Sequence, residues 1–566
     1  MASEQSHPPL RMPDRLFAEL AAGGGSSEAV AFLERGERAR RLLLLRTALA
    51  HIDAVPSPLG PPADAWRVLK AAADQSPDVV EELLLAPQTG GWLAHLLRRV
   101  HHTAPGPPLW AETGHLHVLA VAAALRAGLD ADLAVPLADG ALNLPGLGLA
   151  RLPGGPPGLS TGRAATKAGE LSLTSEAAGS VLVRRPRTVA AAGPQALPDA
   201  GAAPWVPLRT LAHHGPAGTT AILLDDLGAY RDLDEPIGPE RIEDDEAAAW
   251  QDVFDEAADI LAAHRDGPGR LDPSLIQAVV PWDRTATRPP PPPDVALSAT
   301  SGDSFGSMVI TRPGTGLALA ETLVHEFQHS KLSALLHLFP LLDDDREERY
   351  YAPWRGDPRH LTGLLHGAYA FTGVAGFWRD RMAEPRHADV AAYHFALRRT
   401  QTRLVVRTLL TSGRLSASGR RLVTGLARTL DRWLREPVAP GSLARARTAA
   451  ALHRTEWRLR NVLPGPSSGY GDRASLRLRA DRTLWPDPRT RAFAAAPVDP
   501  RTADEHLAAG DAAAALAGYT EALTRDPGEP HLLAGWIVAR TALEPGPAAR
   551  RMLARPESVR PPMTDG

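Results

Sequence analysis

The sequence predicts a multidomain, mainly α protein with a smaller β-rich layer, that is, an α+β fold. The chain has 566 residues, of which 44% are hydrophobic, and this is enough to build roughly three or four domains of ordinary size. Apolar residues recur at helical spacing through most of the chain. One stretch instead carries short β-like runs between Gly and Pro turns, at 170–173, 180–183 and 220–224. We therefore expect several packed cores, most of them helical.

Four segments are expected in chain order: a helical N-terminal region (1–128), a β-rich region (129–235), a metal-binding catalytic core (236–413) and a helical C-terminal region (414–566). In the catalytic core, residues 307–311 are typical of a short strand, and Pro313 and Gly314 are typical of a turn. A helix is then predicted over 315–339, because this stretch has strong helical character. Strand, turn and helix should follow one another directly.

The C-terminal region is predicted to end in a helical hairpin that resembles a tetratricopeptide (TPR) unit, at about 502–543. The small-aromatic-small-Pro spacing of Ala515, Tyr519, Ala522 and Pro527 matches such a hairpin, and Gly510 falls in the turn between its helices. One unit cannot form a solenoid. Two interpretations remain: the hairpin packs on its own domain, or it offers a surface to a peptide or protein partner.

Composition excludes several classes of function. The net charge is −3, so the chain has no overall field that would attract nucleic acid or an anionic membrane. It has no Cys, so a metal site must use His, Asp or Glu. The N-terminus lacks the basic and then apolar pattern of a signal peptide, and no stretch approaches twenty uncharged apolar residues. We expect a cytoplasmic protein.

An HExxH motif lies within the predicted helix over 315–339, from His325 through Glu326 to His329. Residues four apart share one face of a helix, so both imidazoles can bind one metal ion with Glu326 beside it. In a chain with 20 His, chance should place only about 0.04 such motifs. The motif predicts a metal centre.

A third ligand decides the chemistry of such a centre. The metzincin pattern fails, because Leu332 and Leu335 stand where it needs Gly and His. Glu347 and Glu348 lie near the distance expected for a carboxylate ligand on a following helix, but they sit in a charge run that is usually a solvated loop. His366 lies in an apolar helix-like stretch, where a buried imidazole needs a partner, and it is our preferred ligand.

Two arginines between the motif and His366 form a candidate carboxylate clamp. A guanidinium donates two parallel hydrogen bonds, so Arg355 or Arg359 could bind the carboxylate of a 2-oxo acid. In the alternative interpretation this segment is a surface loop in which Arg359 pairs with a carboxylate such as Asp357.

Three segments together resemble a known family. Residues 325–332, 351–359 and 363–371 are similar in order and spacing to the HExxH-type 2-oxoglutarate-dependent peptide β-hydroxylases, formerly described as HEXXH-motif putative peptide-modification proteins. The likeness covers about 307–378. It implies Fe(II), with 2-oxoglutarate and dioxygen as cosubstrates, and hydroxylation at the β-carbon of a residue in a ribosomally made precursor peptide.

The resemblance also implies roles for individual residues. His325, His329 and His366 would be the iron ligands, and Arg355 or Arg359 would anchor the distal carboxylate of 2-oxoglutarate. Some relatives are fused to a radical S-adenosylmethionine enzyme, whose iron-sulfur clusters need Cys. Without Cys, this chain would be the standalone form, and such a partner would be encoded separately.

Two other functions remain open. In a zinc peptidase, Glu326 would be the general base that deprotonates a metal-bound water. In a peptide-binding module without catalysis, the metal site would be structural or vestigial, and the helical C-terminal part would bind the peptide.

Overall fold

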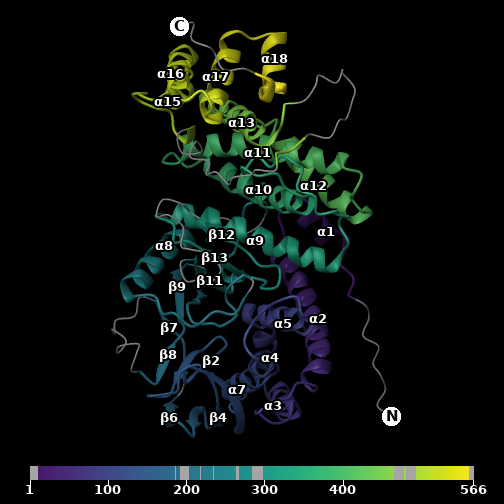
Figure 1. Cartoon of the computed structure of the whole chain (residues 1–566), viewed down its shortest axis with the longest axis vertical. Coiled ribbons are helices and arrows are strands. Elements are labelled where there is room, and N and C mark those ends of the chain that lie inside the picture. The colour runs from purple at the N-terminus through teal and green to yellow at the C-terminus, as the bar shows by residue number, and fades with distance from the viewer. Residues whose placement is uncertain are drawn as a thin grey trace. The chain divides into compact units, whose positions relative to one another are not determined.

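The computed structural model describes residues 10–184, 187–191, 203–216, 218–233, 235–262, 267–282, 297–464, 477–479 and 493–559. The chain forms two compact units (Figure 1). The first comprises Met1–Met12, Ser27–Asp266 and Leu271–Leu338, and the second Pro13–Ser26, Gly267–Arg270 and Phe339–Gly566. The boundary after Leu338 falls inside the segment 236–413, which was predicted as one catalytic core.

The predicted fold class is confirmed, because helices dominate both units and the strands lie in the first. The helices of the first unit are α2 (Ser27–Ile52), α3 (Pro62–Gln75), α4 (Pro77–Leu85), α5 (Pro87–Val100), α6 (Leu109–Thr113), α7 (His115–Ala127), α8 (Asp244–Ala262) and α9 (Gly316–Leu338), with a short 3-10 helix, η1 (Pro273–Leu275). No helix in the described ranges is long and apolar enough to cross a membrane.

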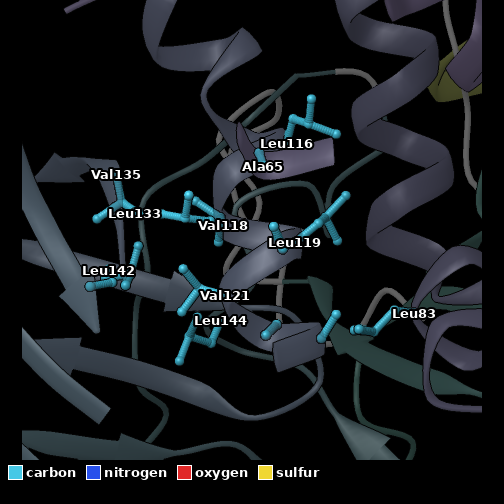
Figure 2. Packing of buried hydrophobic residues seen from close by; sticks show 14 of the residues in the cluster. Ala65, Leu83, Leu116, Val118, Leu119, Val121, Leu133, Val135, Leu142 and Leu144 are labelled. Carbon is cyan, nitrogen blue, oxygen red and sulfur yellow. The ribbon is translucent and has the colours of Figure 1, made fainter. Parts of the chain in front are cut away.

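The first sheet is antiparallel throughout and has the order β6-β5-β4-β1-β2-β3-β8 among the described strands. Its strands are β1 (Ala131–Ala138), β2 (Ala141–Leu144), β3 (Gly148–Arg151), β4 (Leu159–Lys167), β5 (Glu170–Ser175), β6 (Gly179–Arg184) and β8 (Trp205–Pro207). Alternate residues of β1, among them Leu133 and Val135, are buried against α7, which is apolar all round (Figure 2). A helix of that kind needs cover on every side. The sheet and helices α3 to α5 provide it.

The second sheet has the order β12-β13-β11-β10-β9-β7 and positions the metal helix. Its strands are β7 (Val189–Ala190), β9 (Arg209–Gly215), β10 (Gly218–Leu224), β11 (Ala278–Pro281), β12 (Ser298–Ala299) and β13 (Ser307–Ile310). Strands β10, β11 and β13 are parallel, and every residue of β11 and β13 is buried. Parallel strands are usually covered on both faces. Helix α9 contacts β13 and the antiparallel edge strand β12 (Figure 1).

The second unit is helical. It contains α1 (Asp14–Ala21), α10 (Leu361–Arg381), α11 (Ala388–Thr411), α12 (Ala417–Trp433), α13 (Pro440–Asn461), α15 (Ala503–Ala509), α16 (Ala512–Arg525), α17 (Pro530–Leu543), α18 (Pro547–Ala554) and the 3-10 helix η3 (Pro556–Ser558). Helices α10 and α11 pack side by side, as do α11 and α13.

The predicted TPR-like hairpin is present as α15 and α16. Gly510 ends α15 with a φ of 85°, a left-handed conformation that suits Gly at this position. Tyr519 is buried against Gly535 of α17, where a side chain would meet its ring. The hairpin shares a core with α11 and α13 through Tyr393 and Leu452. It therefore packs on its own unit, and its use as a partner surface stays a prediction.

His531 of α17 links the hairpin to α13 through two charged contacts. The His531 imidazole lies between two carboxylates, with Nδ1 3.2 Å from Glu456 Oε2 and Nε2 3.0 Å from Asp504 Oδ2. Burial alone would lower the pKa of His531, but the two carboxylates outweigh it and raise the pKa to about 9. His531 is thus held as a cation between three helices.

Candidate metal centre

Helix α9 begins where the sequence predicts it, and α8 fixes its start. The backbone N–H of Gly316 donates to Glu256 Oε2 at 2.8 Å, so a carboxylate satisfies a free N–H at the positive end of the helix. A Cβ at Gly316 would lie 2.4 Å from Glu256 Cβ, so this close approach requires Gly. The predicted range 315–339 and the observed Gly316–Leu338 differ by one residue at each end.

The motif residues form a group that could hold a metal ion. His325, Glu326 and His329 each offer one ligand atom, and these atoms lie within 4.8 Å of one another. The two Nε2 atoms are 3.2 Å apart. Two nitrogens bound at about 2.1 Å to one ion would lie about 3 to 3.4 Å apart, so the imidazole pair fits a shared metal. Glu326 Oε1 is 3.9 Å from His325 Nε2, which adds a carboxylate to the group.

Glu326 is buried, at 1% exposure, and hydroxyl groups hold its carboxylate. Thr300, which follows β12, donates to Glu326 Oε2 at 2.6 Å. Burial would raise the pKa of Glu326, but the imidazoles of His325 and His329 and the hydroxyls of Ser298 and Thr300 together bring it below its ordinary value. The carboxylate is therefore ionised at neutral pH.

His329 is ready to act as a ligand. Its desolvation, together with the neighbouring His325, lowers the pKa of the imidazole to about 4. A metal binds the neutral ring, so at neutral pH no proton has to leave His329 before an ion can bind.

The preferred third ligand, His366, is half-buried on α10 in the second unit. Next to it, Gly367 accommodates the ring of Trp354, since a Cβ there would lie 2.1 Å from Trp354 Cζ2. Trp354 also stacks on Phe371, with ring centroids 4.7 Å apart. The turn of α10 that carries His366 thus fixes the loop that carries the two arginines. That His366 shares a metal with His325 and His329 stays a prediction.

The structure brings Arg355 and Arg359 together around one carboxylate. Arg355 binds Asp357 with both prongs, at 2.7 Å from Nε and 3.3 Å from the second nitrogen. Arg359 lies 3.7 Å from the same carboxylate. The pairing of Arg359 with Asp357 that we considered from sequence is thus present. A 2-oxo acid bound by either arginine would have to compete with Asp357.

Glu347 and Glu348 are exposed and lie outside any helix. Glu347 forms an ion pair with Arg349. The charge run is thus a solvated loop, and neither residue stands on a following helix, where a carboxylate ligand was expected.

Sequence reasoning missed the residues that hold Glu326. Ser298 and Thr300 lie more than twenty residues before the motif, on and beside a two-residue edge strand. No periodic pattern there points to a role. Only the hydroxyl character of both residues could have suggested one.

Comparisons with known proteins identify no family, because no family model matches the chain and no curated protein is significantly similar to it. The resemblance to the peptide β-hydroxylases therefore stays a prediction.

Proposed function

We propose that the chain is an Fe(II)- and 2-oxoglutarate-dependent oxygenase that hydroxylates the β-carbon of a residue in a ribosomally made precursor peptide. The observation that carries the proposal is the group of His325, Glu326 and His329, which offers two imidazoles and one carboxylate. Non-haem Fe(II) oxygenases typically use two His and one carboxylate; in this proposal His366 is the third ligand, and the Glu326 carboxylate supplies the negative charge beside the ion. The resemblance of residues 307–378 to the family supplies the substrate class.

Each residue has a role in this proposal. His325 and His329 hold the ion as neutral ligands, and His366 completes the set. Glu326, fixed by Thr300, balances the positive charge beside them. Bound iron, with 2-oxoglutarate and dioxygen, supplies the oxidising chemistry that converts a C–H bond to C–OH. Arg355 or Arg359 anchors the distal carboxylate of 2-oxoglutarate after exchanging Asp357 for it.

The substrate peptide would be made and modified in the cytoplasm. A radical S-adenosylmethionine enzyme encoded separately is the proposed maturation partner, because this chain has no Cys for iron-sulfur clusters.

A zinc peptidase is the second candidate, because Glu326 lies beside the imidazole pair where such an enzyme keeps its general base. In that enzyme Glu326 would deprotonate a metal-bound water, whereas in the proposed oxygenase it only balances the charge of the ion. The two candidates therefore differ in the reaction they catalyse.

One experiment separates the two candidates. Anaerobically purified protein is given Fe(II), 2-oxoglutarate and air, and succinate is measured; in parallel, the zinc-loaded protein is incubated with an unstructured peptide mixture. We expect succinate and no cleavage. His329→Ala should abolish succinate formation, whereas His214→Ala, which changes an exposed histidine on β9, should not. Cleavage with zinc, without succinate from iron, would replace the proposal with the peptidase.

A further inference from the structure

A cavity of about 340 Å³ lies in the first unit, and α9 contributes no residue to it among the described residues that line it. It lies between the start of α7, the strands β1 to β4 and the segment that follows β10. A single water needs only about 10–15 Å³ by the same kind of measure. The cavity is thus far larger than a packing defect, and its size is typical of a small-molecule site.

The lining is mostly apolar with a few polar groups. Val118, Leu142 and Ile237 contribute to the apolar wall. Glu112 and Asn143 also border the cavity, but Glu112 Oε2 and Asn143 Oδ1 are fully covered by protein atoms and offer no hydrogen bond to an occupant. The surface that an occupant would meet is therefore mainly apolar.

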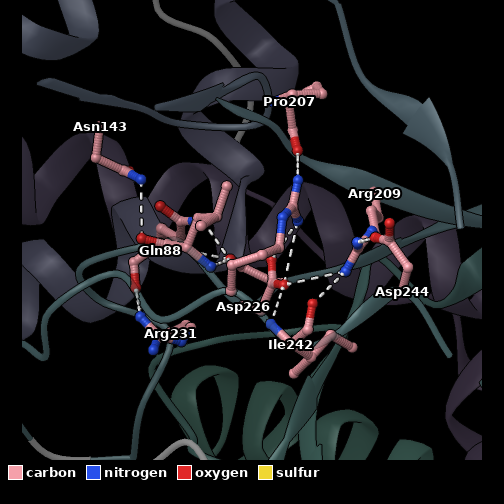
Figure 3. A network of polar contacts seen from close by, with 12 residues as sticks. Gln88, Asn143, Pro207, Arg209, Asp226, Arg231, Ile242 and Asp244 are labelled. Carbon is pink, nitrogen blue, oxygen red and sulfur yellow. Dashed lines mark hydrogen bonds and ion pairs between the residues drawn. The ribbon is translucent and has the colours of Figure 1, made fainter. Parts of the chain in front are cut away.

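Hydrogen bonds fix the segment after β10, which forms one wall of the cavity (Figure 3). Asn143 Nδ2 donates to the carbonyl of Leu227 at 2.9 Å, which joins β2 to this segment. The buried carboxylate of Asp225 accepts the backbone N–H of Gly228 at 2.8 Å, and Arg231 donates to the Gly228 carbonyl at 2.7 Å. The segment is thus held by β2 and by hydrogen bonds between its own residues. The cavity therefore belongs to the fold and does not depend on a loose loop.

The charges around the cavity indicate a neutral ligand. Glu112 hydrogen-bonds His95 and lies 3.8 Å from Arg99, so its negative charge is already balanced. Burial lowers the pKa of His115 to about 3, so that imidazole is uncharged at neutral pH. A charged ligand would find no partner of opposite charge in the lining, and the loss of its hydration would not be compensated.

We propose that this cavity binds a neutral small molecule with a largely apolar body. The site is separate from the metal centre and does not depend on the proposed function.

The test uses 1-aminoanthracene, a neutral fluorescent amine that brightens in apolar sites. We expect it to bind the full chain saturably, and 1-octanol to displace it better than octanoate at pH 8, because octanoate carries a charge for which the cavity has no partner. Leu159 lines the cavity and is 40% exposed, so it lies at the opening. Leu159→Trp should weaken probe binding by at least about tenfold.

Two control variants place the signal. Leu182→Trp changes another exposed leucine of the same sheet, 49% exposed and outside the cavity, and should not affect binding. Ala73→Phe fills a separate apolar groove of about 190 Å³ between the N-terminal helices and should not affect it either. Binding that survives Leu159→Trp but is lost in Ala73→Phe would overturn the proposal. So would octanoate competing as well as octanol, or no saturable binding at all.

Discussion

Replacing Thr300 by Val tests whether the hydroxyl beside Glu326 supports the metal centre. Val keeps the shape of Thr but removes the donor that lies 2.6 Å from Glu326 Oε2. A hydrogen bond to a charged group contributes about 1.5–3 kcal/mol, and each 1.4 kcal/mol is a factor of ten in affinity. If this bond orients the carboxylate toward a bound cation, Thr300→Val should weaken metal binding about ten- to hundredfold. Loss of an outer partner of a metal ligand commonly has an effect of this size.

The affinity would be measured by competing the apoprotein against a fluorescent chelator for Co(II) or Fe(II) under anaerobic conditions. Thr322→Val is the matched control. Thr322 lies on α9, the helix of Glu326, but its hydroxyl donates to the carbonyl of Ala318 at 2.8 Å, one turn earlier. We expect this control to keep its affinity within about twofold. Unchanged affinity in Thr300→Val, with a large loss in Glu326→Gln, would mean that other contacts orient the carboxylate. Unchanged affinity in both would remove Glu326 from the metal group.

Three further outcomes are expected. Both His366→Ala and His329→Ala should lower bound iron well below one equivalent when metal is measured after dialysis; full iron content in His366→Ala would move the third ligand elsewhere. Arg355→Lys should raise the apparent dissociation constant for 2-oxoglutarate at least about tenfold with iron content intact, since Lys lacks the two-pronged donor. The charge-transfer absorption of the anaerobic Fe(II) complex reports this, and no change in both Arg355→Lys and Arg359→Lys would place the clamp outside the loop. The pKa of His531 is raised to about 9 from 6.5, so its stabilising contribution is complete below about pH 6.5 and is lost as the pH rises through 9. The melting temperature should therefore fall more between pH 7 and 10 in the parent than in His531→Asn, and equal slopes would contradict this.

Local pattern predicted the local structure well. The strand expected over 307–311 is β13, and the helix expected over 315–339 is α9, because Pro313 and Gly314 mark the turn between them. The β-like runs at 170–173 and 220–224 fall within β5 and β10. Each of these elements could be predicted from the periodicity of its own residues and from the turns that bound it.

The division into units could not be predicted in this way, because it depends on contacts distant in sequence. Residues 267–270 belong to the second unit, although both neighbouring segments belong to the first. Gly269 has a φ of 81° and lies so close to α10 that a Cβ would be 2.0 Å from the backbone N of Phe377. A sequence pattern shows a Gly in a turn but does not show which helix it approaches.

In the candidate site, too, the sequence predicted the contacts within one element but not those between distant elements. The pairing of His325 with His329 follows from the pitch of one helix. The hydroxyl of Thr300 reaches Glu326 only because β12 pairs with β13, whose register sets Ala299 opposite Val309. Such a contact is a property of the sheet and not of any motif.

Two variants identify the residue that supplies the carboxylate at the proposed metal centre. The sequence suggested Glu347 or Glu348, whereas the structure groups Glu326 itself with the two imidazoles. If Glu326 binds the ion directly, α9 alone supplies two His and one carboxylate, and Glu326→Gln should lower iron content as much as we expect for His329→Ala. If Glu326 only balances charge nearby, Glu326→Gln should still contain iron but bind it less tightly. In that case His366 is needed as the third ligand. Iron content in Glu326→Gln and His366→Ala, measured side by side, therefore distinguishes a centre built on one helix from one that also needs α10.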